Sequence, residues 1–412
     1  MKTFKVRNII VLIYHSFNDP LFQNQIYKHL LKTAKDKRYN IYLITFENDI
    51  YRMTSIAQER MTKNLVNKNI FWYPQKYHGG NLLVLKKSFD LFRAIIIVLK
   101  LRLTNNTPLI FAYTNLSASI SIVCAKLLKM KLLVYCYEPH SGYLIELGIW
   151  KEKSLKYKLS NWLEMQVGKY ADYIFASTIH VVKMLRSLNP KGKIYRQPII
   201  VDSDEFKFKP KGRQRIREQY GIDNKKVMLY LGKFGYLYYE KEIVEICKVL
   251  ENNLDNIFFL IVTSNDHDDI IKMFIDTGLR NESYVITGNL TYDEVKDYIS
   301  ASDIGLSAVP PTLSQKYRSP NKVGEYLLCG LPYITCKGIA EDDYYAEKYN
   351  VGAVVKSFCE KDVLSSLDKI NDLLSEEKEV LRLRCRKVGI EYRGSSSYYR
   401  KLNEIFDEVF NH

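Results

Sequence analysis

The sequence has no apolar run long enough to cross a bilayer. Its longest, Ala94 to Leu99, is far short of the roughly 20 residues that a spanning helix needs. Its seven cysteines are an odd number without any CxxC spacing, which predicts reduced thiols rather than a disulfide framework. No GxGxxG follows the first expected strand and no GxxxxGK occurs, which argues against a dinucleotide-dependent dehydrogenase and a P-loop kinase. A GxSxG motif and a persuasive metal-ligand cluster are also missing.

The composition is that of a globular protein with excess positive charge. The 412 residues are 47% apolar and 26% charged, and the length predicts two domains. Lys and Arg number 61 against 46 Asp and Glu, a net charge of +15. This balance favours contact with phosphates, whether of nucleotides, nucleic acid or anionic lipid.

The first half alternates short apolar runs with longer helical patterns. The N-terminal apolar run lacks a cleavage site and predicts a first strand rather than a signal peptide. Continuous apolar runs such as LIFAY are typical of parallel strands covered on both faces. The predicted strands are Asn8–Tyr14, Asn40–Phe46, Asn69–Tyr73, Pro108–Tyr113, Lys131–Tyr137, Tyr173–Ser177 and Lys193–Gln197.

A second α/β cycle follows a break rich in Pro, Asp and Lys. Its predicted strands are Val227–Gly232, Ile257–Thr263, Tyr284–Thr287, Ile304–Ser307, Tyr333–Cys336 and Val351–Val355. We therefore expect two Rossmann-like, doubly wound α/β domains facing a cleft. The expected bounds are 1–199 for the N-terminal domain, 200–222 for a linker, 223–390 for the C-terminal domain, and 391–412 for a C-terminal helix that can pack back on the N-terminal domain.

The segment SPNKVGEYLLCGLP, which begins at Ser319, predicts a helix with a charged start. Ser319 suits the N-cap and Pro320 the first helical position. Lys322 and Glu325 share a helix face, and Lys316 and Arg318 precede them. Free N–H groups and cations suit a diphosphate, and a carboxylate can accept hydrogen bonds from ribose hydroxyls. From spacing alone, a solvated Lys–Glu pair on a capped helix is the favoured interpretation.

This segment resembles the nucleotide-sugar segment of family-4 retaining glycosyltransferases, which read roughly SPTKxxEYLAxGxPVI. LYLGKFGYLYYEKEI, VITGNLTYDEVKDYISASDIGLS and the stretch KGIAEDD from Lys337 resemble further segments of that family, in the same order. The resemblance implies the glycosyltransferase B fold, retention of anomeric configuration and no essential metal or other cofactor. It also implies donor contacts from a set of residues: Gly232, Lys233, Gly235, Gly288, Lys316, Ser319, Asn321, Glu325 and Glu341.

Two positions depart from the family pattern. Tyr317 stands where many members have a second glutamate, eight residues before Glu325. Lys233 follows Gly232 where an arginine is common. We therefore expect Lys316, Arg318 and Lys322 to be the phosphate cations, with Arg318 and Lys322 as the catalytic pair that stabilises the departing diphosphate.

In the N-terminal half, Glu138 and His140 follow the strand LLVYCY. Ligands of open α/β sheets bind beyond the carboxyl ends of strands, so both residues are candidates to orient or deprotonate an acceptor hydroxyl. A capped loop with a satisfied histidine is the alternative. The loop from His15 after the first strand is similarly placed.

Residues Lys86–Arg102 and Lys151–Lys158 combine bases with apolar side chains. Such helices can lie on anionic membranes, although a core helix with solvated basic ends has the same pattern.

These observations predict a hexosyltransferase-type glycosyltransferase. Its expected partners are a nucleotide-sugar donor and a glycan or lipid-linked saccharide acceptor, for capsule, O-antigen or another surface glycan. We expect it in the cytoplasm, either free or peripheral on the inner face of the cell membrane. The alternatives are a nucleotide-sugar 2-epimerase on the same scaffold and a non-enzymatic nucleic-acid-binding protein. The latter is disfavoured because the positive charge is diffuse.

Overall fold

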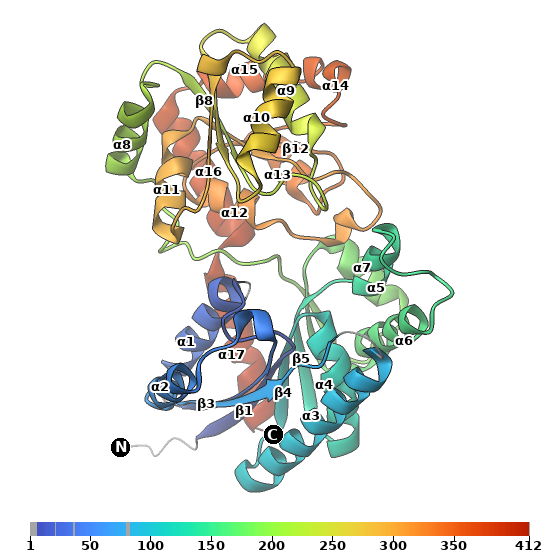
Figure 1. Cartoon of the computed structure of the whole chain (residues 1–412). Coiled ribbons are helices and arrows are strands. Elements are labelled where there is room, and N and C mark those ends of the chain that lie inside the picture. Colours follow the sequence, from blue (N-terminus) through green and yellow to red (C-terminus); the bar gives the residue numbers. More distant parts are fainter. Residues whose placement is uncertain (1–5, 21, 36–37, 80–82, 412) are drawn as a thin grey trace. The chain divides into compact units, whose positions relative to one another are not determined.

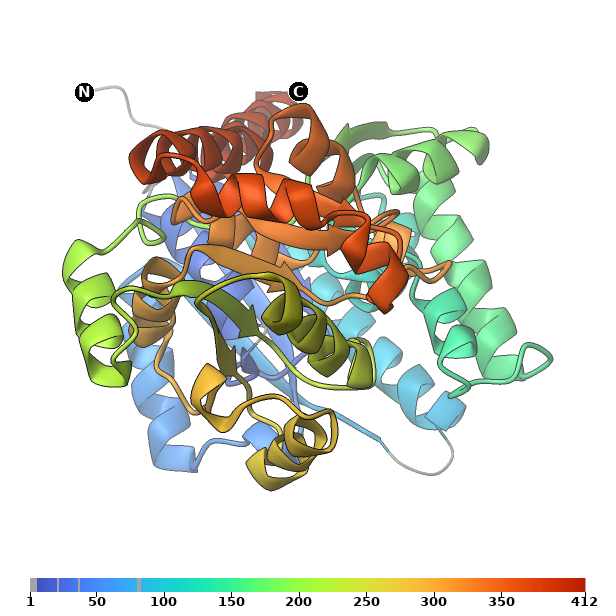
Figure 2. The same cartoon turned by 90° about the horizontal axis from the view of Figure 1, so that it is seen from above.

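The chain folds into two α/β units. The computed structural model describes residues 6–20, 22–35, 38–79 and 83–411. The first unit comprises Met1–Gln197 with Tyr399–His412, and the second comprises Pro198–Tyr398. Each unit is built on one sheet of parallel strands with helices on both faces (Figures 1 and 2).

The first sheet has seven strands in the order β3-β2-β1-β4-β5-β6-β7. Its strands are β1 (Arg7–Ile13), β2 (Tyr39–Glu47), β3 (Ile70–Lys76), β4 (Leu109–Tyr113), β5 (Lys131–Tyr137), β6 (Tyr173–Ala176) and β7 (Lys193–Arg196). Its helices are η1 (Phe22–Tyr27), α1 (Lys28–Ala34), η2 (Asp49–Tyr51), α2 (Ser55–Val66), α3 (Leu83–Asn105), α4 (Asn115–Leu128), α5 (His140–Glu146), α6 (Leu155–Tyr170) and α7 (Ile179–Ser187). Both α3 and α6 pack against α4 (Figure 1).

The second sheet has six strands in the order β10-β9-β8-β11-β12-β13. Its strands are β8 (Lys226–Leu231), β9 (Ile257–Val262), β10 (Tyr284–Thr287), β11 (Ile304–Ser307), β12 (Tyr333–Cys336) and β13 (Gly352–Val355). Its helices are α8 (Pro210–Tyr220), α9 (Lys241–Asn253), α10 (His267–Asp276), η3 (Asn281–Ser283), α11 (Tyr292–Ala301), η4 (Gln315–Tyr317), α12 (Asn321–Leu328), α13 (Asp342–Lys348), α14 (Glu360–Leu364), α15 (Leu367–Ser375) and α16 (Lys378–Arg393).

Both sheets reverse their strand order at one point. The reversal lies between β1 and β4 in the first sheet and between β8 and β11 in the second. The chain leaves the two strands at such a point toward opposite faces, which opens a crevice at their carboxyl ends. All thirteen predicted strands are confirmed, each end within three residues of its expected place. The predicted doubly wound fold class is therefore confirmed.

Part of the expected linker is instead a helix of the second unit. We expected a linker over 200–222, but Pro210–Tyr220 forms α8, with Pro210 in the first turn and Gly221 in the left-handed region as its C-cap. Ile216 is buried against the second core. Residue 201 also pairs with the end of α16, where the Val201 N–H donates to the Arg393 carbonyl at 3.0 Å.

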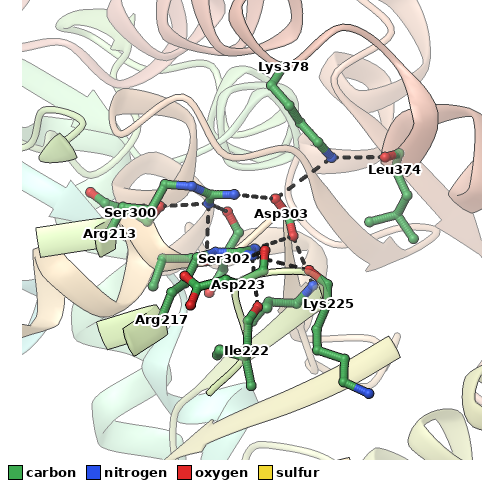
Figure 3. A network of polar contacts seen from close by, with 12 residues as sticks. Arg213, Arg217, Ile222, Asp223, Lys225, Ser300, Ser302, Asp303, Leu374 and Lys378 are labelled. Atoms are coloured by element: carbon green, nitrogen blue, oxygen red, sulfur yellow. Dashed lines mark hydrogen bonds and ion pairs between the residues drawn. The ribbon is translucent and has the colours of Figure 1, made fainter. Parts of the chain in front are cut away.

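A buried carboxylate explains why α8 docks where it does. Asp303, directly before β11, accepts from Arg217 at 2.6 Å and from Arg213 at 3.0 Å, and Lys378 of α16 lies 3.7 Å away (Figure 3). Burial alone would raise the pKa of Asp303, but Arg217 and its two neighbouring cations lower it. The sequence pattern shows no sign of this cluster, because its members come from three separate segments.

The C-terminal helix α17 (Ser395–Asn411) starts in the second unit and belongs to the first from Tyr399 onward. Within the first unit Asp407 accepts from Arg7 at 2.6 Å, and Glu408 accepts from Lys193 at 2.7 Å. The Phe406 ring packs on Tyr39. The six cysteines whose side chains are described are free. Within the described residues, no helix combines the length and the apolar character that a membrane span requires.

Candidate donor-sugar site and acceptor-side residues

Helix α12 begins at the carboxyl edge of the second sheet, after the long loop that follows β11. Its first residue is Asn321, and Pro320 occupies the N-cap position without a side-chain cap. The prediction that Ser319 caps this helix is wrong. The Ser319 hydroxyl instead accepts from the Ile199 N–H at 3.2 Å and bonds the buried guanidinium of Arg393. The first N–H groups of α12 therefore have no side-chain cap, as an anion-binding helix start requires.

Lys322 and Glu325 lie together on the first turns of α12. The Lys322 ammonium is 2.9 Å from a Glu325 carboxylate oxygen, which confirms the shared face. Glu325 is 9% exposed and Lys322 remains half-buried. Burial raises the pKa of the neighbouring Tyr292, and the negative charge of Glu325 adds to that shift. The pair thus offers one cation and one nearly buried acceptor at the strand-order reversal.

The glycine loop after β8 is fastened to its neighbours. Gly235 has a φ of 73°, which favours glycine. The Phe234 N–H donates to the Asn265 side chain at 3.0 Å, and the Tyr239 N–H donates to the Ala308 carbonyl at 3.1 Å. This loop therefore bonds the chain that follows β9 and the chain that follows β11.

The other two glycines and Lys233 hold distinct places. A side chain at Gly288 would lie 2.1 Å from the Thr263 carbonyl oxygen, so the loop after β10 needs glycine there. Gly232 donates its N–H to the Val262 carbonyl at 3.0 Å. Lys233 is exposed, and its carbonyl accepts from the Tyr230 hydroxyl.

The remaining predicted donor-site residues flank α12 and α13. Lys316 lies in η4, with its ammonium 5.0 Å from the Tyr317 ring centre, and Arg318 follows that turn. Glu341 stands at the N-cap of α13, after β12. Asn321 has a buried side-chain oxygen without a hydrogen-bond partner in the structure. All of these positions follow strands β11 or β12 at the same sheet edge.

A buried ion pair supports both helix starts and was missed by sequence reasoning. Arg393, fully buried at the end of α16, bonds Asp342 at 2.8 Å and the hydroxyl of Ser319. The Tyr392 hydroxyl donates to the same Asp342 oxygen at 2.9 Å. Burial raises the pKa of Asp342, although the charge of Arg393 opposes the shift. No sequence motif indicates this pair, because its members are 51 residues apart.

In the first unit, His140 is the first residue of α5 and Glu138 precedes it by two residues. His140 is exposed, and the Glu138 carbonyl accepts from the Asn115 side chain at 2.9 Å. The sequence did not point to Glu164 of α6. This buried carboxylate accepts from the backbone N–H groups of Ser141 at 2.8 Å and His140 at 3.2 Å. Burial raises the pKa of Glu164 to about 7.

Within the described residues, no three His, Cys, Asp or Glu side chains are grouped as a metal site would need. No protein-family model matches the chain. No curated protein matches it significantly either.

Solved structures share its fold across nearly the whole chain. HepE from Anabaena in complex with UDP is 11% identical with a TM-score of 0.68, covering 98% of this chain and 100% of that one. Sucrose-phosphate synthase from Thermosynechococcus elongatus is 15% identical with a TM-score of 0.71 and the same coverage. A putative UDP-N-acetylglucosamine 2-epimerase from Listeria monocytogenes, 9% identical, has a TM-score of 0.57 and covers 99% of this chain and 97% of that one. The fold of this chain is the glycosyltransferase B fold.

Proposed function

We propose that the protein is a glycosyltransferase that moves a sugar from a nucleotide-diphosphate sugar to an acceptor hydroxyl. The observation that carries the proposal is the Lys322–Glu325 pair on an uncapped helix start, at the reversal point of the second sheet. HepE, which shares the fold, was crystallised with UDP and with UDP-glucose, so a UDP-sugar is the first donor to test.

We assign each residue of this site a separate role in donor binding or catalysis. Glu325 accepts hydrogen bonds from the ribose hydroxyls, and the N–H groups of α12 face the diphosphate. Lys322 and Arg318 stabilise the negative charge that grows on the leaving diphosphate. Lys316 and the loop from Gly232 to Gly235 complete the donor contacts. No metal is required in this arrangement.

We propose that transfer retains the anomeric configuration. The acceptor oxygen forms a bond to the anomeric carbon while the bond from that carbon to the diphosphate oxygen breaks. The acceptor proton passes to the departing diphosphate, which balances the step without an enzyme nucleophile. His140 or Glu138 orients the acceptor hydroxyl.

The acceptor side of the proposal is a saccharide of a surface glycan such as capsule or O-antigen, free or lipid-linked, at the inner face of the cell membrane. Support comes from two exposed apolar stripes of the first unit. On α3 the stripe comprises Leu85, Phe89, Phe92, Ile96, Leu99 and Leu103, and on α6 it comprises Leu155, Leu159 and Trp162. Their spacing of three and four residues places each set on one helix face. Lys86, Arg93 and Lys100 accompany the α3 stripe, a combination suited to an anionic bilayer.

A panel of UDP, GDP, dTDP and CMP in a thermal-shift assay tests the donor assignment. A nucleotide at 100 times its dissociation constant adds about 2.7 kcal/mol to stability, which raises the melting temperature measurably. If no nucleotide shifts the melting temperature, the donor assignment is wrong.

The second candidate is a nucleotide-sugar 2-epimerase, because a putative one shares the fold. An epimerase converts its nucleotide sugar without an acceptor, whereas the transferase releases nucleoside diphosphate only when an acceptor accepts the sugar. Incubation with UDP-sugars alone, followed by separation of epimers, therefore distinguishes the two.

A further inference from the structure

The first unit contains a cavity that the donor site does not use. Its volume is about 300 Å³, and it lies where α3, α4 and α6 begin. Tyr14 directly after β1 and Tyr77 directly after β3 also line it, together with His140. The cavity is therefore at the carboxyl edge of the first sheet, where open α/β sheets bind ligands.

The walls of this cavity combine aliphatic and aromatic side chains with a few polar ones. Its apolar side chains are Leu91, Leu116, Ile120, Trp150, Leu159 and Leu163. Lys87 and Lys156 are its only fixed charges among the described lining residues, and both are positive. An apolar cavity whose described lining includes two cations and no acidic residue suits a ligand with an apolar chain and an anionic head.

One of the two cations is held firmly in place. The Lys87 ammonium donates to the Tyr14 hydroxyl at 2.7 Å and lies 3.5 Å from the Tyr77 ring centre. Asp90, fully buried, is 3.9 Å from that ammonium. The same carboxylate bonds the Tyr14 hydroxyl and contacts the His78 ring at 2.5 Å. The Lys87 side chain is thus held in one position by a buried polar cluster.

We infer that this cavity binds the apolar chain of an amphiphilic acceptor, an alkyl or isoprenyl chain that bears a phosphate or diphosphate head. The inference rests on the proposed function, because it names the class of acceptor that the transferase uses. Lys87 and Lys156 pair with the phosphate, and the apolar side chains of the wall cover the chain. The exposed stripe lies on the same helix as Lys87, Ser88 and Leu91 of the cavity wall, so we expect a chain that leaves a bilayer to reach the cavity along α3.

The three tryptophans provide a direct binding signal. Trp72, Trp150 and Trp162 all belong to the first unit, and only Trp150 lines the cavity. The full chain is titrated with decyl phosphate that carries bromine on its last carbon, because bromine quenches indole fluorescence on contact. We expect saturable quenching that disappears in Trp150→Phe, while unlabelled decyl phosphate still competes in the parent protein. Inorganic phosphate should neither quench nor compete.

Matched variants on α6 distinguish binding of the probe in the cavity from its adsorption on the surface. Leu159→Gln, in the cavity wall, should weaken binding about tenfold, whereas Leu155→Gln, one turn earlier and outside the wall, should leave it unchanged. Lys156→Ala should weaken decyl phosphate about tenfold but not bromodecanol, with exposed Lys158→Ala as the control. All four positions are partly exposed, so these variants should fold.

The outcomes that overturn the inference are distinct from failure of the proposed function. If quenching does not saturate, or if Leu155→Gln and Leu159→Gln lose the same probe affinity, the cavity does not bind the chain, even if UDP still raises the melting temperature. If the probe fails to bind and the protein sediments as a dimer that Leu159→Gln dissociates, the cavity is an interface between two copies. Saturable quenching without any nucleotide shift rejects the donor assignment and leaves chain binding in place.

Discussion

At the scale of single residues, Glu325 is the most informative position. It is nearly buried, and its carboxylate accepts a hydrogen bond from the Lys322 ammonium, the cation that we propose contacts the diphosphate. Family resemblance suggested its role, and the structure brings Lys322 beside it. The role itself remains a prediction.

Glu325→Ala should weaken nucleotide binding by about 1.5–3 kcal/mol, because a charged hydrogen-bond acceptor for the ribose is removed. The ligand-free protein should lose little stability, about 1 kcal/mol or less, since the Lys322 ammonium that loses its partner is itself partly exposed. Calorimetric titration of the cognate nucleoside diphosphate measures the effect. Glu282→Ala, an exposed carboxylate before β10, is the matched control. Equal affinity in the two variants would remove Glu325 from the site.

Lys322→Ala and Arg318→Ala should slow transfer more than they weaken binding of the nucleoside. Both cations are expected to act on charge that develops at the leaving diphosphate, an effect of about 10²-fold or more on kcat. Steady-state kinetics of each variant, beside titration with the nucleoside, separates the two effects. Lys272→Ala, an exposed lysine of α10, should behave as the parent protein. A variant with full turnover takes its residue off the list of catalytic groups.

Glu164 links the stability of the first unit to pH. Its pKa rises from 4.5 to about 7 on folding because of burial, so the folded state holds a proton that the unfolded state releases between these values. The protonated form therefore stabilises the fold below pH 4.5, and this contribution is lost as the pH rises toward 7. Glu164→Gln has no carboxyl group to titrate, so its unfolding free energy should not show this loss. The unfolding free energy of the parent minus that of the variant should therefore fall by about 3 kcal/mol across that window.

Urea unfolding at pH 5 and pH 8 measures this difference. Tryptophan fluorescence reports it cleanly, because all three tryptophans belong to the first unit. A parent-minus-variant difference that does not change with pH would show that Glu164 is ionised throughout.

At the scale of elements, the starts of α12 and α13 depend on the end of α16. Asp342 and Arg393 are both fully buried, and Arg393 also bonds the Ser319 hydroxyl before α12. A buried pair is costly to break, because the remaining partner keeps an uncompensated charge.

Asp342→Ala should therefore destabilise the second unit by about 3–5 kcal/mol. The double variant Asp342→Leu with Arg393→Met should lose less, since neither charge remains buried. Urea unfolding followed by far-ultraviolet circular dichroism measures both, because the second unit has no tryptophan. If the double variant is the less stable of the two, the pair contributes more than its charges alone explain.

At the scale of the whole molecule, the net charge of +15 is relevant to membrane binding, because some of the basic residues accompany exposed apolar side chains. The sequence left open whether Lys86–Arg102 is a buried crossover helix or a membrane-binding one. In the structure α3 has both kinds of face: Ala94, Val98 and Leu101 are buried, while the stripe from Leu85 to Leu103 is exposed, and membrane binding by that stripe stays a prediction. Each base near an anionic surface contributes about 1 kcal/mol to binding.

We expect the protein to sediment with vesicles that contain anionic lipid at low salt, and to be released by high salt. Ile96→Asp should abolish this binding, because it puts a charge at the centre of the α3 stripe. Ile275→Asp, at an exposed apolar position of the second unit, should not. Absence of sedimentation at low salt would reject membrane docking and leave the sugar-transfer proposal untouched.

The sequence by itself determined the strands, the two α/β cycles and the charged start of α12. These features are local: continuous apolar runs mark buried parallel strands, and a three-residue spacing places Lys322 beside Glu325. Even its error at β3 is local. The prediction ended at Tyr73 before Pro74, but β3 is an edge strand, where proline is tolerated, and it continues to Lys76.

Only the tertiary structure decided which distant groups meet. The Asp303 cluster, the Arg393–Asp342 pair, the carboxylate of Glu164 at the start of α5, and the cavity between α3 and α6 all join separate segments. Helix α8 belongs with them, since its Arg217 and Arg213 dock on a carboxylate 86 and 90 residues away. Periodicity reveals which face of an element is apolar, but not which element covers it. The partners of buried charges and the walls of cavities are set by that packing.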